Sequence, residues 1–146
     1  MKRHESLIPL SQDHKSTLFL AGQLKFNAPD YPGYPKDIHG KTALLAGEFE
    51  FHIKEHFRKE EEILFKSVRN KSPELRKLTN ELVLEHHKIT QLIQQALLKS
   101  AAELLHEIGE MLQQHIRKEE RQLFELIQQT LSENELLDLG KKLKTD

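Results

Sequence analysis

The stretch HFRKEEEILF, residues 56–65, returns near the other end of the chain as HIRKEERQLF, residues 115–124. Both copies place a glutamate four residues after a histidine. On an α-helix this spacing puts the two side chains on one face, with Cβ atoms about 6 Å apart. The repeat is either a charged surface written twice or two halves of one site, and the apolar residues around it decide between these explanations.

The apolar residues predict an all-α fold. They recur at steps of three and four over segments too long to be strands. Glycine and proline are scarce, and three of the five prolines sit together in NAPDYPGYP, residues 27–35, which we expect to be the one long loop. The predicted helices span about residues 10–27, 37–69, 73–98 and 101–130, with a tail helix at about 133–143.

Signals for helix starts support this division. SPEL, residues 72–75, places serine at an N-cap and proline at the first helical position, and SAAE (100–103) and SENE (132–135) both have the capping-box pattern. The second, third and fourth helices are joined by short connections, which favour antiparallel neighbours. We therefore expect an up-down-up-down antiparallel four-helix bundle with a short C-terminal helix, in which residues 1–146 form a single domain.

The composition excludes several kinds of protein. Without cysteine there are no disulfides and no thiolate sites, so any metal must be held by histidine and carboxylate. Lys and Arg (22) nearly balance Asp and Glu (23), which argues against nucleic acid as a partner. No apolar stretch approaches the length needed to span a bilayer, and the N-terminus lacks the apolar core of a secretion signal. We expect a cytoplasmic protein with no membrane partner.

Histidine and glutamate interrupt the apolar stripe of every long helix. An ionisable group in such a stripe costs several kcal/mol unless it is paired or bound to a metal, so four coincident interruptions are not accidental. The stripes run Leu10, His14, Leu18 and Ala21; Leu45, Phe49, His52, His56, Glu60 and Ile63; Leu75, Leu78, Leu82, His86, Ile89, Ile93 and Leu97; and Leu104, Ile108, Leu112, His115, Glu119 and Leu123.

Counting residues to the turns places the histidines at one depth. His56 lies about 13 residues before one turn and His86 about 13 after it, and His115 lies about 15 residues after the next turn. His14 joins them if KDIHG, residues 36–40, is an irregular start to the second helix. The four histidines are then expected to meet in one layer of the bundle.

The two glutamates of the repeat complete a candidate metal site. Imidazole suits iron, zinc, copper and nickel, and carboxylates bridge paired metals about 3.5 to 4 Å apart. Two bridging glutamates and four terminal histidines would hold a dinuclear site with coordination positions left open. The candidate ligands are His14, His56, Glu60, His86, His115 and Glu119.

Other polar residues near these positions receive different predictions. His52 lies on a stripe but has Met111 as its counterpart in the repeat, so we expect it beside the site and not as a ligand. Glu61 and Glu120 are expected to face solvent or to hydrogen-bond a ligand histidine from outside. The stripe passes through His86 and leaves His87 on the flank of its helix. His4, His39 and His106 are expected to be ordinary histidines.

The motifs DHK (13–15), HFRKEE (56–61), EHHKI (85–89) and HIRKEE (115–120) resemble those of the hemerythrin-like, or HHE cation-binding, domain over nearly the whole chain. The resemblance implies a four-helix bundle around two iron ions, a non-haem di-iron centre with an oxo or hydroxo bridge, held by the six residues above. Oxygen-carrying hemerythrins have a fifth histidine one turn along the third helix, where this chain has Leu82 and Thr90. The chain is more similar to the bacterial four-His, two-Glu type.

That type is linked to sensing of oxygen or nitric oxide and to repair of damaged iron centres. The resemblance therefore implies a protein that binds or reacts with a small molecule such as oxygen, nitric oxide or peroxide, and it leaves open whether the protein is an enzyme. An iron storage, delivery or repair factor is one alternative, and a helical interaction module with a structural metal, perhaps zinc or another divalent ion, is a second. The sequence leaves the oligomeric state open, with a homodimer as one option.

Overall fold

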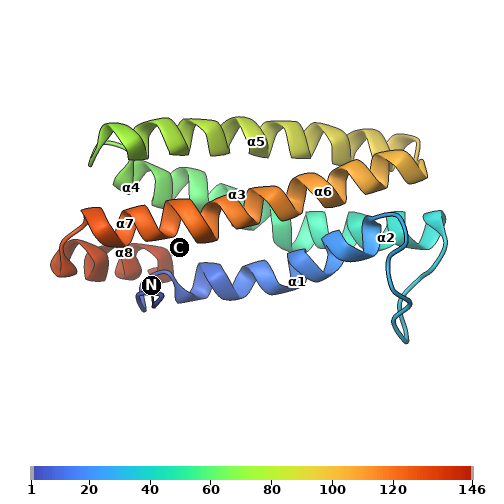
Figure 1. Cartoon of the computed structure of the whole chain (residues 1–146), viewed down its shortest axis with the longest axis horizontal. Coiled ribbons are helices and arrows are strands. Elements are labelled where there is room, and N and C mark those ends of the chain that lie inside the picture. Colours follow the sequence, from blue (N-terminus) through green and yellow to red (C-terminus); the bar gives the residue numbers. More distant parts are fainter. Residues whose placement is uncertain (1, 146) are drawn as a thin grey trace.

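The computed structural model describes residues 2–145, and within that range every regular element is helical, which confirms the all-α prediction (Figure 1). Three helices are plain α-helices: α1 (Ile8–Leu24), α5 (Pro73–Leu98) and α8 (Glu133–Thr145). The other two helical stretches contain wider π-helical turns. The first joins α2 (Ile38–Glu48), η1 (Phe49–Ile53), α3 (Lys54–Lys59), η2 (Glu60–Phe65) and α4 (Lys66–Val68), and the second joins α6 (Ala102–Lys118), η3 (Glu119–Leu123) and α7 (Phe124–Thr130).

Two of the three predicted helix starts are capped as the sequence indicates. The Ser72 hydroxyl accepts a hydrogen bond from the backbone N–H of Leu75 at 3.1 Å, ahead of α5. Ser132 and Glu135 bond each other's backbone N–H groups at 3.2 and 2.9 Å, which closes a capping box at α8. The prediction for SAAE is wrong, because Ala101 is the N-cap of α6 and offers no side-chain oxygen.

The connection between α1 and α2 differs from the prediction. α1 ends at Leu24, three residues early, because Lys25 is extended and Asn27 has a φ of 58°. The irregular start expected at residues 36–40 is wrong: the Asp37 side chain accepts a hydrogen bond from the N–H of Gly40, and α2 is regular from Ile38. The loop, residues 25–37, protrudes at this end of the molecule and spans the offset between the two helices (Figure 1).

The long helical stretches run along the longest axis, and α8 contacts η2 and lies near the N-terminus (Figure 1). α1 and α5 both pack along α6, and both also contact α2. The buried apolar side chains form two separate clusters. One includes Leu10, Leu64 and Leu82, and the other includes Ala21, Leu45 and Ile89. A polar layer separates the two clusters, and the candidate site lies in it.

The π-helical turns change which side chains face the core. η2 begins at Glu60 and η3 at Glu119, so each copy of the repeat carries a wide turn directly after its paired glutamate. A wide turn contains an extra residue and shifts the following side chains around the helix axis. As a result Leu64 is fully buried, whereas Ile63, which the sequence placed on the stripe, is only half-buried. The stripes also misplace Leu18 and Leu97, which are 37% and 42% exposed.

Gly109 allows α6 to approach α1 closely, since a Cβ atom at this position would lie 2.5 Å from the carbonyl oxygen of Ala21. We expect Gly109→Ala to lower the free energy of unfolding by about 1 to 3 kcal/mol, because the helices must move apart. Gly22→Ala is the matched control: it lies in α1 with no atom within 4 Å of the added methyl, and it should raise the free energy by about 0.5 to 1 kcal/mol. Urea denaturation measures both, and equal effects would contradict the close approach.

Candidate metal centre

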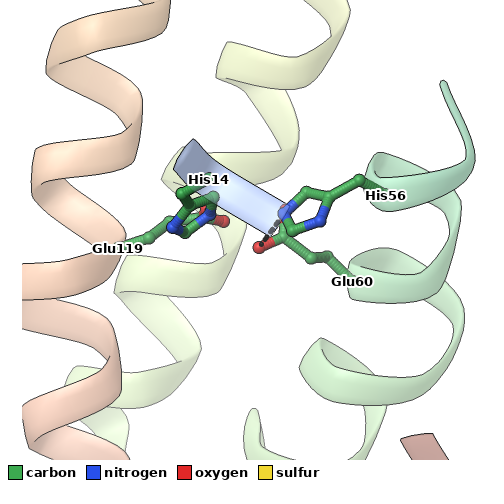
Figure 2. A group of neighbouring side chains, drawn as sticks. All are labelled: His14, His56, Glu60 and Glu119. Atoms are coloured by element: carbon green, nitrogen blue, oxygen red, sulfur yellow. Dashed lines mark hydrogen bonds and ion pairs between the residues drawn. The ribbon is translucent and has the colours of Figure 1, made fainter. Parts of the chain in front are cut away.

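The polar layer brings all six predicted ligands together. His14 comes from α1, His56 from α3, His86 from α5 and His115 from α6, while Glu60 begins η2 and Glu119 begins η3. None of the six is more than 8% exposed. They form two groups of four with potential ligand atoms within 4.8 Å of one another: His14, His56, Glu60 and Glu119 (Figure 2), and Glu60, His86, His115 and Glu119. Both glutamates belong to both groups.

Each glutamate turns one oxygen toward each group. Glu60 Oε2 lies 3.3 Å from His56 Nε2, and its Oε1 lies 3.1 Å from His86 Nε2. Glu119 Oε1 lies 2.9 Å from His14 Nε2, and its Oε2 lies 3.5 Å from His115 Nε2. Two carboxylates placed in this way between two pairs of imidazoles are suited to bridge two cations.

Four buried atoms of the layer have no hydrogen-bond partner: His56 Nε2, Glu60 Oε2, His115 Nε2 and Glu119 Oε2. The two short His–Glu approaches among them are therefore contacts without hydrogen-bond geometry. A buried polar atom left unsatisfied costs about 1 to 3 kcal/mol, and more when the group is charged. A cation bound by these nitrogens and oxygens would remove that cost, so the residues present fit a metal centre.

The other ring nitrogen of each histidine is hydrogen-bonded to an outer carboxylate. The Nδ1–O distances are 2.6 Å for His14 with Glu120, 2.7 Å for His86 with Glu61, 2.8 Å for His115 with Glu85 and 3.3 Å for His56 with Asp13. A carboxylate that accepts from Nδ1–H orients the ring, directs Nε2 inward and makes the imidazole a stronger ligand. All four outer carboxylates come from a different helix than their histidine.

The buried carboxylates keep protons on the imidazoles in the absence of a metal. Burial, the largest influence, lowers the pKa of His14, but the hydrogen bonds to Glu119 and Glu120 outweigh it and raise that pKa to about 9. The pKa of His115 is raised to about 10, because attraction to Glu119 and Glu85 outweighs its burial. Metal ligation requires neutral imidazoles, so a cation entering this layer would displace protons.

Aromatic rings wall the layer above and below. Phe57 stacks on His86 with ring centroids 3.9 Å apart, and Phe65 lies 5.8 Å from the same ring. Phe124, the counterpart of Phe65 in the repeat, is parallel to His14 at 5.8 Å. These phenylalanines belong to the two apolar clusters, so the imidazoles pack directly against both clusters and their rotation is restricted.

Sequence reasoning missed part of the layer. It expected Glu61 and Glu120 either in solvent or bonded to a ligand histidine, and the structure shows the second arrangement. It gave no role to Asp13, and it cited Glu85 only as part of a motif. The available signal was an acidic residue next to a ligand in DH, EE, EH and EE, at positions 13–14, 60–61, 85–86 and 119–120.

The remaining histidines lie outside the two groups. His52 Nε2 lies 2.9 Å from the backbone oxygen of Asp13, beside the site as expected. His87 is exposed on the flank of α5. His4 contacts Glu133 at 3.0 Å, and His106 stacks on Phe26.

A small cavity adjoins the candidate centre. It is lined by His14, His56, His115 and Glu119, and by Thr17, Ile53, Phe57, Leu112 and Ile116. Its size allows about one water molecule. Apart from the candidate ligands, none of the described residues that line it has an ionisable side chain. The cavity therefore adjoins histidines of both groups and otherwise has uncharged walls.

Comparison with known proteins is consistent with this geometry. A model of the hemerythrin HHE cation-binding domain matches residues 9–127. No curated protein and no solved structure matches the chain. None of the helices described over residues 2–145 combines the length and apolar character required to cross a membrane.

The choice between two neighbouring histidines on α5 can be tested directly. We expect His86→Ala to lose at least one metal per chain, because the ring contacts Glu60 and Glu61 inside the layer. The matched control His87→Ala should keep the full metal content, since that ring is exposed. Metal analysis of both purified variants measures the difference. Metal loss from the His87 variant alone would show that α5 is assigned the wrong inner face.

Proposed function

Because the chain belongs to the hemerythrin HHE cation-binding family, we propose that its polar layer holds two iron ions in a non-haem dinuclear centre that binds a small molecule such as oxygen, nitric oxide or peroxide. The observation that carries the proposal is the placement of Glu60 and Glu119, each with one oxygen toward each histidine pair. A single cation would use only one of the two groups.

Each residue has a definite role in this proposal. His14 and His56 would be terminal ligands of one ion, His86 and His115 would be terminal ligands of the other, and the two glutamates, which belong to both groups, would be shared. Each ion then has four protein ligands, fewer than iron accepts, so positions remain open for an external molecule. Bound iron would supply the ligand-binding and redox chemistry that histidine and glutamate lack.

The cavity supports a small external molecule. It touches His14 and His56 of one pair and His115 of the other, so a molecule inside it would adjoin both ions. Its remaining walls are the side chains of Thr17, Ile53, Phe57, Leu112 and Ile116. Among these residues no group could act as a general acid, which favours binding or sensing over turnover with proton transfer.

The alternatives receive less support. A delivery factor must release its metal, whereas here the ligands are almost fully buried and each imidazole is fixed by an outer carboxylate. A purely structural metal would not require a cavity next to the ligands. We also propose that the chain forms one domain, an up-down-up-down four-helix bundle. The contacts of α1 and α5 with both α6 and α2 agree with this topology. A cytoplasmic location stays a prediction.

Metal content and optical absorption test the proposed function. Protein produced with iron should contain two iron ions per chain, and its absorption under anaerobic conditions should change on addition of nitric oxide or oxygen. Incubation with a mild chelator should leave the iron in place, because the ligands are buried. A colourless protein containing only zinc would contradict the proposal, and rapid loss of iron to the chelator would favour a delivery role.

Replacing the bridging carboxylates should affect one ion more than the other. Glu60→Gln and Glu119→Gln each remove a negative charge that would be shared by both ions. We therefore expect each variant to bind one iron at a free iron concentration that fills both sites of the unchanged protein. Glu62→Gln is the matched control, because Glu62 is exposed and pairs with Arg58. Metal titration followed by absorption measures the two binding steps. Two ions with an unchanged spectrum in both variants would show that neither glutamate bridges.

A further inference from the structure

A second and larger pocket lies outside the candidate centre. It has a volume of about 460 Å³, within the range of small-molecule sites, and it is formed by the first turns of α1, by α8 and by Lys59 at the end of α3. Pro9, Leu10, Leu137 and Leu143 give it apolar walls. None of the six candidate ligands lines it, although Asp13, which orients His56, does.

The internal repeat shows what is unusual about Lys59. Its counterpart Lys118 is neutralised by Glu85, whose Oε2 lies 2.5 Å from the ammonium, and by Glu81 at 3.7 Å. The residue that corresponds to Glu85 is Asp13, because each bonds Nδ1 of the histidine in one copy of the repeat. Asp13 is one methylene shorter, and Lys59 forms no ion pair with it or with any other described residue.

The pocket therefore places a lysine that forms no short ion pair beside an apolar wall, although the Lys59 charge still helps to lower the pKa of Asp13. Lys141 and Lys144 of α8 also line it, and neither forms an ion pair with any residue between 2 and 145. Two acidic residues, Glu5 and Asp13, oppose the three lysines, and Asp13 also accepts from His56, so the lining carries one more positive than negative side chain. A ligand that fits both features carries a negative group at one end and an apolar body at the other.

We propose that this pocket binds a small organic anion, namely a monocarboxylate with a short alkyl chain, whose carboxylate pairs with Lys59 and whose chain packs on Leu10, Leu137 and Leu143. A lysine ammonium binds a single carboxylate well as a compact charge, and the apolar walls favour an alkyl chain over inorganic phosphate. None of the six candidate ligands lines this pocket, and its one link to the candidate centre is Asp13, which accepts from His56.

Calorimetric titration of the full-length, metal-loaded protein tests the site, with hexanoate as the probe. Hexanoate should bind, and affinity should fall about threefold to fourfold for each methylene removed down to acetate. Hexylammonium has the same chain with the opposite charge and should not bind. No binding of hexanoate, or equal binding of hexylammonium, would overturn the proposal. Tighter binding of inorganic phosphate than of hexanoate would overturn the choice of a monocarboxylate.

Substitutions distinguish binding in this pocket from binding to lysines elsewhere on the surface. Lys59→Gln keeps most of the side chain and should weaken hexanoate about tenfold or more, because the charge-assisted contact is lost. The control Lys66→Gln removes an exposed lysine of α4 outside the pocket and should leave the affinity unchanged. Leu137→Asn changes a 38% exposed residue of the wall and should also weaken hexanoate. Equal affinity in Lys59→Gln and Lys66→Gln would contradict the site, whatever the metal content.

Discussion

The structure depends on a closed ring of four hydrogen bonds between helices. Each bond joins an outer carboxylate on one helix to Nδ1 of a histidine on the next, and the last returns to the first helix. Because each bond fixes one residue of a helix against one residue of its neighbour, the ring sets the relative depth of all four helices. The pairs are Asp13 with His56, Glu61 with His86, Glu85 with His115, and Glu120 with His14.

The ring also explains why ionisable groups can lie between two apolar clusters. Outer carboxylates hold Nδ1 of each imidazole, so Nε2 can only face inward, toward Glu60 and Glu119. Without a cation the inner layer retains unsatisfied buried atoms and protonated histidines, whose charge stabilises the two glutamates. Two cations would satisfy the same atoms, and this makes metal binding and the packing of the bundle parts of one arrangement.

Much of this could be predicted from the sequence, because helical periodicity reports which side chains share a face. The repeat and the interrupted stripes identified His14, His56, Glu60, His86, His115 and Glu119, and the structure brings those six together. The position of the π-helical turn η2 could not be predicted, because it alters the periodicity only after Glu60, at Ile63 and Leu64. Helical periodicity also could not predict which histidine each outer carboxylate bonds, because the carboxylate and its histidine lie on different helices.

The internal repeat makes the two ends of the layer comparable, and their difference is informative. At one end Lys118 neutralises the carboxylate that orients His115. At the other end Asp13 orients His56 over a longer distance, and Lys59 faces a pocket instead. The two copies of this ten-residue repeat thus differ in their surroundings, and beside the first copy a lysine lines a pocket open to an external group.

Anomalous scattering from crystals of the iron-loaded protein tests the central claim most directly. Two iron peaks about 3.5 to 4 Å apart should lie between Glu60 and Glu119, one beside His14 and His56 and the other beside His86 and His115. A single iron peak within the layer, or iron bound only outside it, would contradict the account.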